Sequence, residues 1–116
     1  MEDSPNISGG GKNVFNIGFT PENLARHWRG GISDHSWQYH GYTKERYAAE
    51  ALDLIQSSTN DTIVGYKNEL GQVIRYDTTE NNFVIGHPNI GIATMFKPTN
   101  GIEYYYEKAG DEAMED

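Results

Sequence analysis

Histidines are the first side chains in this sequence that suggest acid–base chemistry. Three of the four, His27, His35 and His40, fall within fourteen residues, and the fourth is His87. Histidine is the side chain best suited to moving protons near neutral pH. Such groups suffice for RNA cleavage by the RNA's own 2′-hydroxyl, in which a base removes the hydroxyl proton and an acid protonates the departing 5′-oxygen.

The same reaction needs donors that stabilise a crowded phosphorane, and cationic or hydroxyl side chains do this. Arg75, Thr94 and the three consecutive tyrosines Tyr104–Tyr106 are candidates. Each also has a structural interpretation. Arg75 can form a surface salt bridge with Asp77, which lies two residues along on the same face of a strand. Threonine is ordinary in strands, and alternation buries one of the tyrosines. The residues alone leave both interpretations open.

The histidines allow two other interpretations. His27, His35 and His40 are conceivable metal ligands, but their spacings of eight and five residues form no compact ligand motif. His40 and His87 are more typical of packed, hydrogen-bonded side chains, and His87 precedes Pro88 in a turn. We therefore predict no metal site and no cofactor.

Composition indicates one small globular domain. The chain has 116 residues, of which 36% are hydrophobic and 22% charged, and it has no cysteine. A second core has no room at this length, and disulfides and cysteine nucleophiles are excluded. No stretch approaches the roughly 18 apolar residues of a membrane span, and residues 1–12 lack a signal-peptide pattern. If this domain crosses a membrane, something else must carry it.

The formal net charge of −8 argues against nucleic-acid binding, because phosphate contacts need lysine and arginine. The distribution weakens this objection. Residues 13–106 carry ten acidic and seven basic side chains, which is a net charge of −3. The remaining negative charge lies near the two ends of the chain.

Residues 1–12 are rich in Ser, Gly and Asn, which predicts a flexible linker. Residues 108–116 predict an acidic tail, so residues 13–107 are expected to form the single domain. Thr20, Pro21 and Glu22 predict the start of a short helix that runs to about Trp28. Thr43 predicts the N-cap of a second helix. The apolar stripe of that second helix consists of Tyr47, Ala48, Ala51, Leu52 and Ile55.

Past Ser57 the pattern is that of β-strands separated by turn residues. The predicted strands are Thr62–Lys67, Gln72–Asp77, Asn82–Gly86 and Gly91–Lys97, with Glu103–Glu107 as a candidate fifth. Connections this short require antiparallel hairpins. The fold class is therefore α+β, with N-terminal helices packed on a twisted antiparallel sheet of four to five strands.

Several motifs in this order resemble a known family. They are the segments 71–77 (GQVIRYD), 82–84 (NFV) and 91–98 (GIATMFKP), together with a histidine, His35, eight residues before the threonine-capped helix. The pattern resembles the C-terminal RNase toxin domains of bacterial polymorphic and contact-dependent inhibition toxins, which have the barnase–EndoU–colicin–RelE-like fold. The resemblance covers about residues 20–106.

The resemblance implies that RNA, often tRNA, is cut without metal on the exposed face of the sheet. It implies a general acid/base role for His35 and a phosphate-clamping role for Arg75. Thr94 would be a phosphate or transition-state donor, His27 a second acid/base or substrate contact, and Tyr105 an additional site residue. It also implies that the domain is carried on a larger secreted or cell-surface effector, acts in the cytoplasm of the target cell, and is neutralised by an immunity protein.

The sequence departs from the family pattern beside His35. Asp34 stands where family members usually have a lysine, and Gln38 stands where a glutamate usually follows. The missing lysine and the net charge keep one alternative open, a protein-interaction module in which the catalytic site has decayed. A metal-dependent nuclease that uses the clustered histidines is a second alternative, but it lacks the paired carboxylates of a two-metal site.

Overall fold

A computed structural model gives the arrangement of the chain, and it describes residues 15, 17–28 and 38–110. The predicted linker 1–12 and residues 111–116 of the predicted tail lie outside this part. The described elements are α1 (Pro21–His27), α2 (Lys44–Ile55), β1 (Ile63–Lys67), β2 (Val73–Asp77), β3 (Asn82–His87), β4 (Gly91–Phe96) and α3 (Ile102–Ala109). None of the described helices has the length and apolar character needed to cross a membrane.

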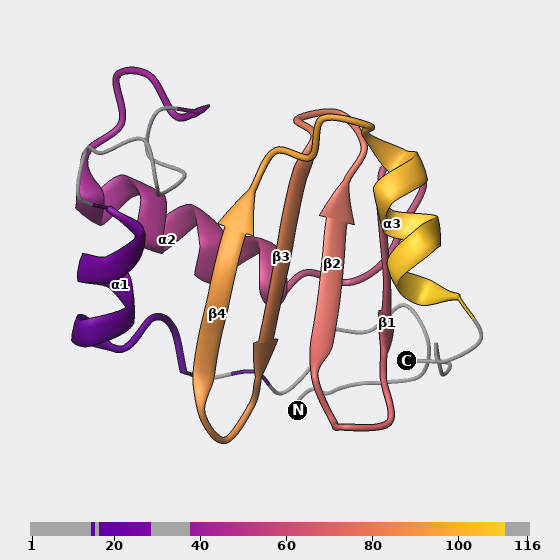
Figure 1. Cartoon of the computed structure of the whole chain (residues 1–116), viewed down its shortest axis with the longest axis horizontal. Helices are drawn as coiled ribbons and strands as arrows, with labels where there is room; N and C mark the ends of the chain where they lie inside the picture. The colour runs from indigo at the N-terminus through magenta and orange to yellow at the C-terminus, as the bar shows by residue number, and fades with distance from the viewer. Residues whose placement is uncertain (1–14, 16, 29–37, 111–116) are drawn as a thin grey trace, which may run out of the picture.

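The four strands form an antiparallel sheet in the order β1-β2-β3-β4, as the short connections predicted. Helix α2 crosses one face of this sheet, and α3 lies on the opposite side near β1 (Figure 1). We call these the α2 face and the α3 face. The fold is the expected α+β class, with helices packed on a four-stranded sheet.

Both N-terminal helices begin at the predicted threonines. Thr20 Oγ1 accepts a hydrogen bond from the Asn23 N–H at 3.2 Å, and Thr43 Oγ1 accepts one from the Arg46 N–H at 3.0 Å. These bonds satisfy backbone donors that have no partner within a helix. The prediction of both helix starts is confirmed.

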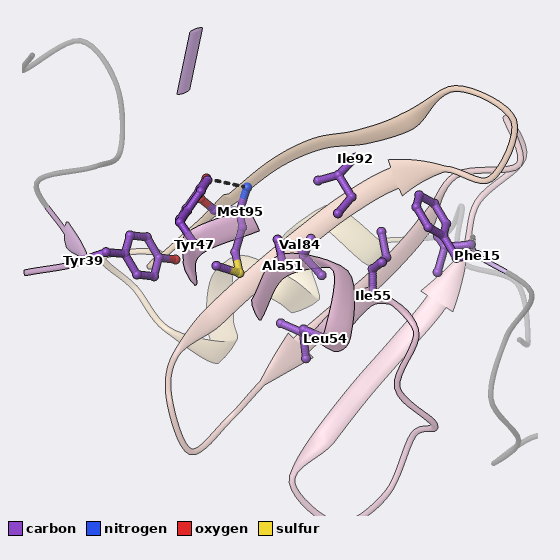
Figure 2. Close-up of a cluster of buried hydrophobic side chains, with 10 residues drawn as sticks. Phe15, Tyr39, Tyr47, Ala51, Leu54, Ile55, Val84, Ile92 and Met95 are labelled. Carbon is purple, nitrogen blue, oxygen red and sulfur yellow. Dashed lines mark hydrogen bonds between the residues drawn. The ribbon is translucent and has the colours of Figure 1, made fainter. Parts of the chain in front are cut away.

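The main core lies between α2 and the sheet (Figure 2). Three residues of the predicted stripe, Tyr47, Ala51 and Ile55, project from α2 toward the strands, and Leu54 joins them. Their partners in the sheet are Val73, Val84, Ile92 and Met95, and Phe15 and Tyr39 complete the cluster. Ala48 and Leu52, also predicted for the stripe, are only partly buried.

A second cluster of buried side chains lies on the α3 face. Tyr105 stacks against Tyr76 with 6.0 Å between ring centroids and contacts Tyr66 at 5.5 Å. Tyr104 meets Phe83 edge-on at 5.1 Å. Because α3 buries these rings, part of the sheet face that the resemblance implied to be exposed is covered.

The prediction of a fifth strand at Glu103–Glu107 is wrong, because these residues belong to α3. Ile102, Tyr105 and Ala109 recur at helical spacing and pack into the second cluster. The helix also extends to Ala109, so it includes the first two residues of the predicted acidic tail.

The outer edge of β4 is covered along its length by groups from other elements. The Ile92 N–H donates to Gly18 O at 3.1 Å, and Asn23 Nδ2 donates to the carbonyls of Ile92 and Ala93 at 2.8 and 2.9 Å. The Tyr47 hydroxyl donates to Met95 O at 2.6 Å and accepts from Met95 N at 3.3 Å (Figure 2).

Candidate functional site

The predicted site residues do not converge on one place. His35 lies outside the described residues. The other four are distributed over both faces of the sheet and over two helices.

Arg75 lies in the interior on the α2 face. Its side chain has 0% exposure, its Nε donates to Ser57 O at 2.9 Å, and its Nη1 donates to Ile74 O at 2.9 Å. The side chain crosses over Gly65 of β1, where a Cβ would come within 2.5 Å of Nη1. The alternative of a surface salt bridge with Asp77 is therefore wrong, and the guanidinium holds backbone carbonyls together.

Thr94 lies on the other face of the sheet. It pairs with Ile85, whereas Arg75 pairs with Val84, and neighbouring residues of a strand point to opposite faces. Thr94 Oγ1 is buried and has no hydrogen-bond partner within the described part of the chain. Tyr105 also contacts the α3 face, but it packs over β1 and β2 against Tyr66 and Tyr76.

His27 is the last residue of α1 and is half-buried. Its Nδ1 lies 2.9 Å from Asn23 O, and its ring lies 5.9 Å from the ring of Phe19. This position is beside β4 and away from both Arg75 and Tyr105, so the structure does not bring the four described residues together.

A pocket of about 350 Å³ lies between α1 and the turn that joins β3 to β4. It contains three groups suited to acid–base and phosphate chemistry: Glu22 and Arg26 from α1, and His87 from the end of β3. The neutral polar side chains Thr20, Asn23 and Gln72 also line it. Among the described pockets, it alone combines an imidazole, a carboxylate and a guanidinium.

The turn after β3 fixes the orientation of His87. The Asn89 N–H donates to Nδ1 of His87 at 3.1 Å, so the neutral ring carries its proton on Nε2. A Cβ on Gly71 would lie 3.1 Å from Nε2. Gly71 has a φ of +85°, a conformation that glycine adopts readily, and its missing side chain leaves space beside the imidazole.

Asn23 positions α1 against the sheet. Its amide nitrogen donates to the carbonyls of Ile92 and Ala93, and its Oδ1 accepts from Nη1 of Arg26 at 3.2 Å. The anchor uses a β-bulge, because the pairing of β3 with β4 shifts between Ile85 and Gly86. One side chain thus joins the helix to β4 and orients the guanidinium of the pocket.

The pKa shifts lie away from this pocket, at the opposite end of β4. Burial raises the pKa of Tyr39, whose hydroxyl donates to Asn82 Oδ1 at 2.9 Å. The pKa of Tyr42 is raised by burial and by its hydrogen bond to Glu50. Nζ of Lys97, from the motif of the resemblance, donates to Asn82 Oδ1 at 3.0 Å and to Glu80 O at 2.9 Å. These contacts hold the loop before α2 against the sheet.

The clustered histidines are conceivable metal ligands by residue type. Across residues 15, 17–28 and 38–110, no three His, Asp or Glu side chains form a group that could hold a metal ion. Of His27, His35 and His40, His35 lies outside these ranges.

His87 is the pocket residue that sequence reasoning passed over. Its place before Pro88 in a turn favoured a packed, hydrogen-bonded side chain over a catalytic one. The backbone N–H of Asn89, two residues along, fixes the ring. Any residue except proline supplies such an N–H, so no residue type in the sequence signals this contact. Comparisons with protein-family models and with curated proteins find no match to this chain.

Proposed function

We propose that this chain is a metal-independent endoribonuclease whose reacting groups lie in the pocket between α1 and the β3–β4 turn. The observation that carries the proposal is the meeting of Glu22, Arg26 and His87 in one pocket of about 350 Å³. These groups are the carboxylate, the cation and the imidazole that cleavage by the RNA's own 2′-hydroxyl requires.

The proposed reaction uses each group once. The Glu22 carboxylate accepts the proton of the 2′-hydroxyl, and the 2′-oxygen bonds to phosphorus. The P–O5′ bond breaks, and the departing oxygen takes the Nε2 proton of His87 in its imidazolium form, which leaves the ring neutral. In that form Nδ1 also carries a proton, so the ring gives up the bond that Nδ1 accepts from Asn89 N–H. Arg26 stabilises the charge on the phosphorane. The products are a 2′,3′-cyclic phosphate and a free 5′-hydroxyl, so atoms and charges balance without a metal.

The sequence motifs supply the biological setting of the proposal. By resemblance to RNase toxin domains, the substrate is RNA of the tRNA class, and the domain acts in the cytoplasm of a target cell after delivery by a larger effector. The producing cell then needs an immunity protein. The proposed partner binds the toxin tightly enough to keep RNA from the pocket.

A protein-interaction module is the second candidate, and the burial of Arg75 favours it. The cation that the resemblance assigns to phosphate has 0% exposure and binds carbonyl groups. The net charge of −8 also opposes RNA binding. Such a module keeps the fold and binds a partner without cleaving RNA.

The test incubates the purified full chain with total bacterial tRNA in excess EDTA and analyses the fragment ends. Wild type is expected to give discrete fragments that end in 2′,3′-cyclic phosphate. His87→Ala is expected to slow cleavage by about 10²-fold or more, which is typical for loss of a general acid. His40→Ala is the matched control, because His40 is exposed and lies outside the pocket.

Each alternative has its own result. Loss of activity with His35→Ala but not with His87→Ala would overturn the pocket assignment and favour the site implied by the resemblance. Cleavage that EDTA abolishes would indicate a metal-dependent nuclease. Intact RNA under all conditions, including addition of cell extract, would contradict the enzyme and favour the interaction module.

A further inference from the structure

The two edges of the sheet differ in how their backbone groups are used. On β4, groups from the segment before α1, from α1, from α2 and from the loop before α2 bind the outward N–H and C=O groups. Gln38 binds the backbone just after β4: its Nε2 donates to Lys97 O at 2.9 Å, and its Oε1 accepts from the Lys97 N–H at 2.8 Å. This edge is therefore closed to further strand pairing.

The ladder of β1 and β2 shows which groups of β1 point outward. The Thr78 N–H donates to Thr62 O at 2.8 Å, and the Asn68 N–H donates to Gln72 O at 3.1 Å. In an antiparallel ladder, residue pairs alternate between hydrogen-bonded and non-hydrogen-bonded positions. The backbone N–H and C=O groups of residues 62, 64, 66 and 68 therefore point toward β2. The N–H and C=O groups of residues 63, 65 and 67 face away from the sheet.

Two of these three outward positions are open. Asn60 satisfies Ile63, because its Oδ1 accepts from the Ile63 N–H and its own N–H donates to Ile63 O, both at 2.8 Å. Within the described residues, no such contact engages the outward groups of Gly65 and Lys67. The open edge, as we call the backbone of Gly65–Lys67, thus presents two donors and two acceptors in strand geometry.

Helix α3 lies near β1 (Figure 1). Residues of both elements line a groove of about 390 Å³ beside the open edge. Val64, Gly65 and Tyr106 are among its lining residues. Tyr106 has 61% exposure, which is unusual for a large ring, and it stands on the outer side of α3. An apolar side chain of an added strand would meet Val64 and Tyr106 in this groove.

Acidic side chains near the groove favour a basic binding partner. Glu103 and Glu107 share the exposed side of α3 with Tyr106, since positions three and four apart lie on one helix face. Asp61 is exposed just before β1. With a net charge of −8, two copies of this chain repel each other, whereas a basic segment is attracted.

We propose that the open edge binds an extended, basic segment of a partner protein as a fifth strand. The backbone of the segment bonds to Gly65 and Lys67, its alternate apolar residues contact Val64 and Tyr106, and its lysine or arginine side chains reach Glu103, Glu107 and Asp61. This surface lies apart from the pocket of Glu22, Arg26 and His87, so the inference stands independently of the proposed RNase activity.

The probe is a short capped peptide of alternating lysine and valine, titrated into the full chain while backbone amide signals are followed by NMR. Lys67→Pro is the decisive variant, because it removes only an outward N–H that β2 does not use. Lys67→Gln is its matched control, because it loses the same charge and keeps the N–H. We expect the peptide to bind wild type and Lys67→Gln, to slow amide exchange at Gly65 and Lys67, and to bind Lys67→Pro at least tenfold more weakly.

A peptide of alternating glutamate and valine is expected not to bind. Should Lys67→Pro fail to fold, the double variant Glu103→Lys/Glu107→Lys replaces it, and it is expected to weaken the basic peptide at least tenfold. Equal binding by the acidic peptide, or undiminished binding by these variants, would overturn the proposal. So would a dimer that forms through Gly65–Lys67, or protection of both amides before peptide is added, because either result identifies another occupant.

Discussion

Arg75 illustrates how much one side chain contributes when it is surrounded by backbone. Its Nε donates to Ser57 O, just beyond α2, and its Nη1 donates to Ile74 O, within β2. Gly65 leaves the space through which the side chain passes. The guanidinium therefore joins the end of a helix to the middle of a sheet, and a buried carbonyl that loses such a donor is costly.

We expect Arg75→Ala to lower the free energy of unfolding by about 3 kcal/mol, from a new cavity and an unsatisfied Ser57 carbonyl. Arg75→Lys is expected to lower it by less, because the ammonium keeps one donor but cannot reproduce the fork of the guanidinium. Urea unfolding followed by circular dichroism measures both. If Arg75→Lys lost RNA cleavage at unchanged stability, a phosphate role would replace the structural one.

Gly65 allows a second test at the same site. A Cβ there would come within 2.5 Å of both Nη1 of Arg75 and the carbonyl oxygen of Ile74. Because the second contact is with backbone, rotation of a side chain cannot relieve it. We expect Gly65→Ala to lower the free energy of unfolding by about 2 kcal/mol or more, as overpacking does. Gly41→Ala is the control, because a Cβ there would meet no atom within 4 Å. Its φ of +80° still adds backbone strain, so we expect a loss in the free energy of unfolding that is smaller than that of Gly65→Ala.

The buried phenol of Tyr39 predicts a loss of stability in alkali. Burial raises its pKa above the ordinary value of 10.0, so the unfolded chain loses this proton first. The stability from the neutral phenol is present below pH 10.0 and decreases as the pH rises further. We expect the thermal midpoint to fall between about pH 9 and pH 11, and to fall less steeply in Tyr39→Phe. Tyr106→Phe, an exposed tyrosine, should leave the slope unchanged.

At the scale of elements, the covered edge of β4 links three parts of the chain. Tyr47 reaches from α2 to both backbone groups of Met95, and Asn23 reaches from α1 to the bulge. Tyr47→Phe keeps the ring in the core and removes only the hydroxyl. We expect it to lower the free energy of unfolding by about 2 kcal/mol, because two backbone groups lose a partner. Hydrogen exchange at the Met95 amide should increase, and an unchanged rate would contradict the edge contact.

The helices α1 and α2 and the four strands were predictable because their signals are local. Threonine caps and alternating apolar residues act within a few positions of the chain. Helix α3 was missed because three tyrosines favour strands and Gly101 offers no side-chain cap. Its helical form depends on tyrosine rings that pack against Tyr66, Tyr76 and Phe83. These contacts join residues far apart in the sequence, so a pattern of neighbouring residues does not reveal them.

The site was harder to predict than the fold because a single bulge decides which residues meet. Simple alternation from Ile92, which packs under α2, would place Thr94 on the same face as Arg75. The extra residue Ala93 in the bulge turns Thr94 to the α3 face instead. The bulge also supplies the carbonyls that anchor α1, so the same irregularity that separates two predicted residues forms one wall of the pocket.

At the scale of the whole molecule, the net charge of −8 gives the proposed ribonuclease a salt dependence that differs from that of basic nucleases. Basic proteins lose RNA affinity as salt rises, because binding releases counterions. Here long-range repulsion opposes the approach of RNA, and salt screens it over distances of about 10 Å at 0.1 M. We expect KM for tRNA to fall as ionic strength rises from about 0.01 M to 0.1 M, and to rise again when contacts to Arg26 are screened.

Neutralising Asp111, Glu112, Glu115 and Asp116 to their amides changes the net charge from −8 to −4. These residues lie outside the described part of the chain, and each amide keeps the size of the side chain while it removes the charge. We expect the variant to have a lower KM at low salt, so that KM falls less as ionic strength first rises. We expect kcat to stay unchanged, because the substitutions leave the pocket residues as they are. Steady-state cleavage of tRNA across a salt series measures both constants. A KM that rises with salt from the start, in wild type and variant alike, would mean that local basic contacts outweigh the net charge.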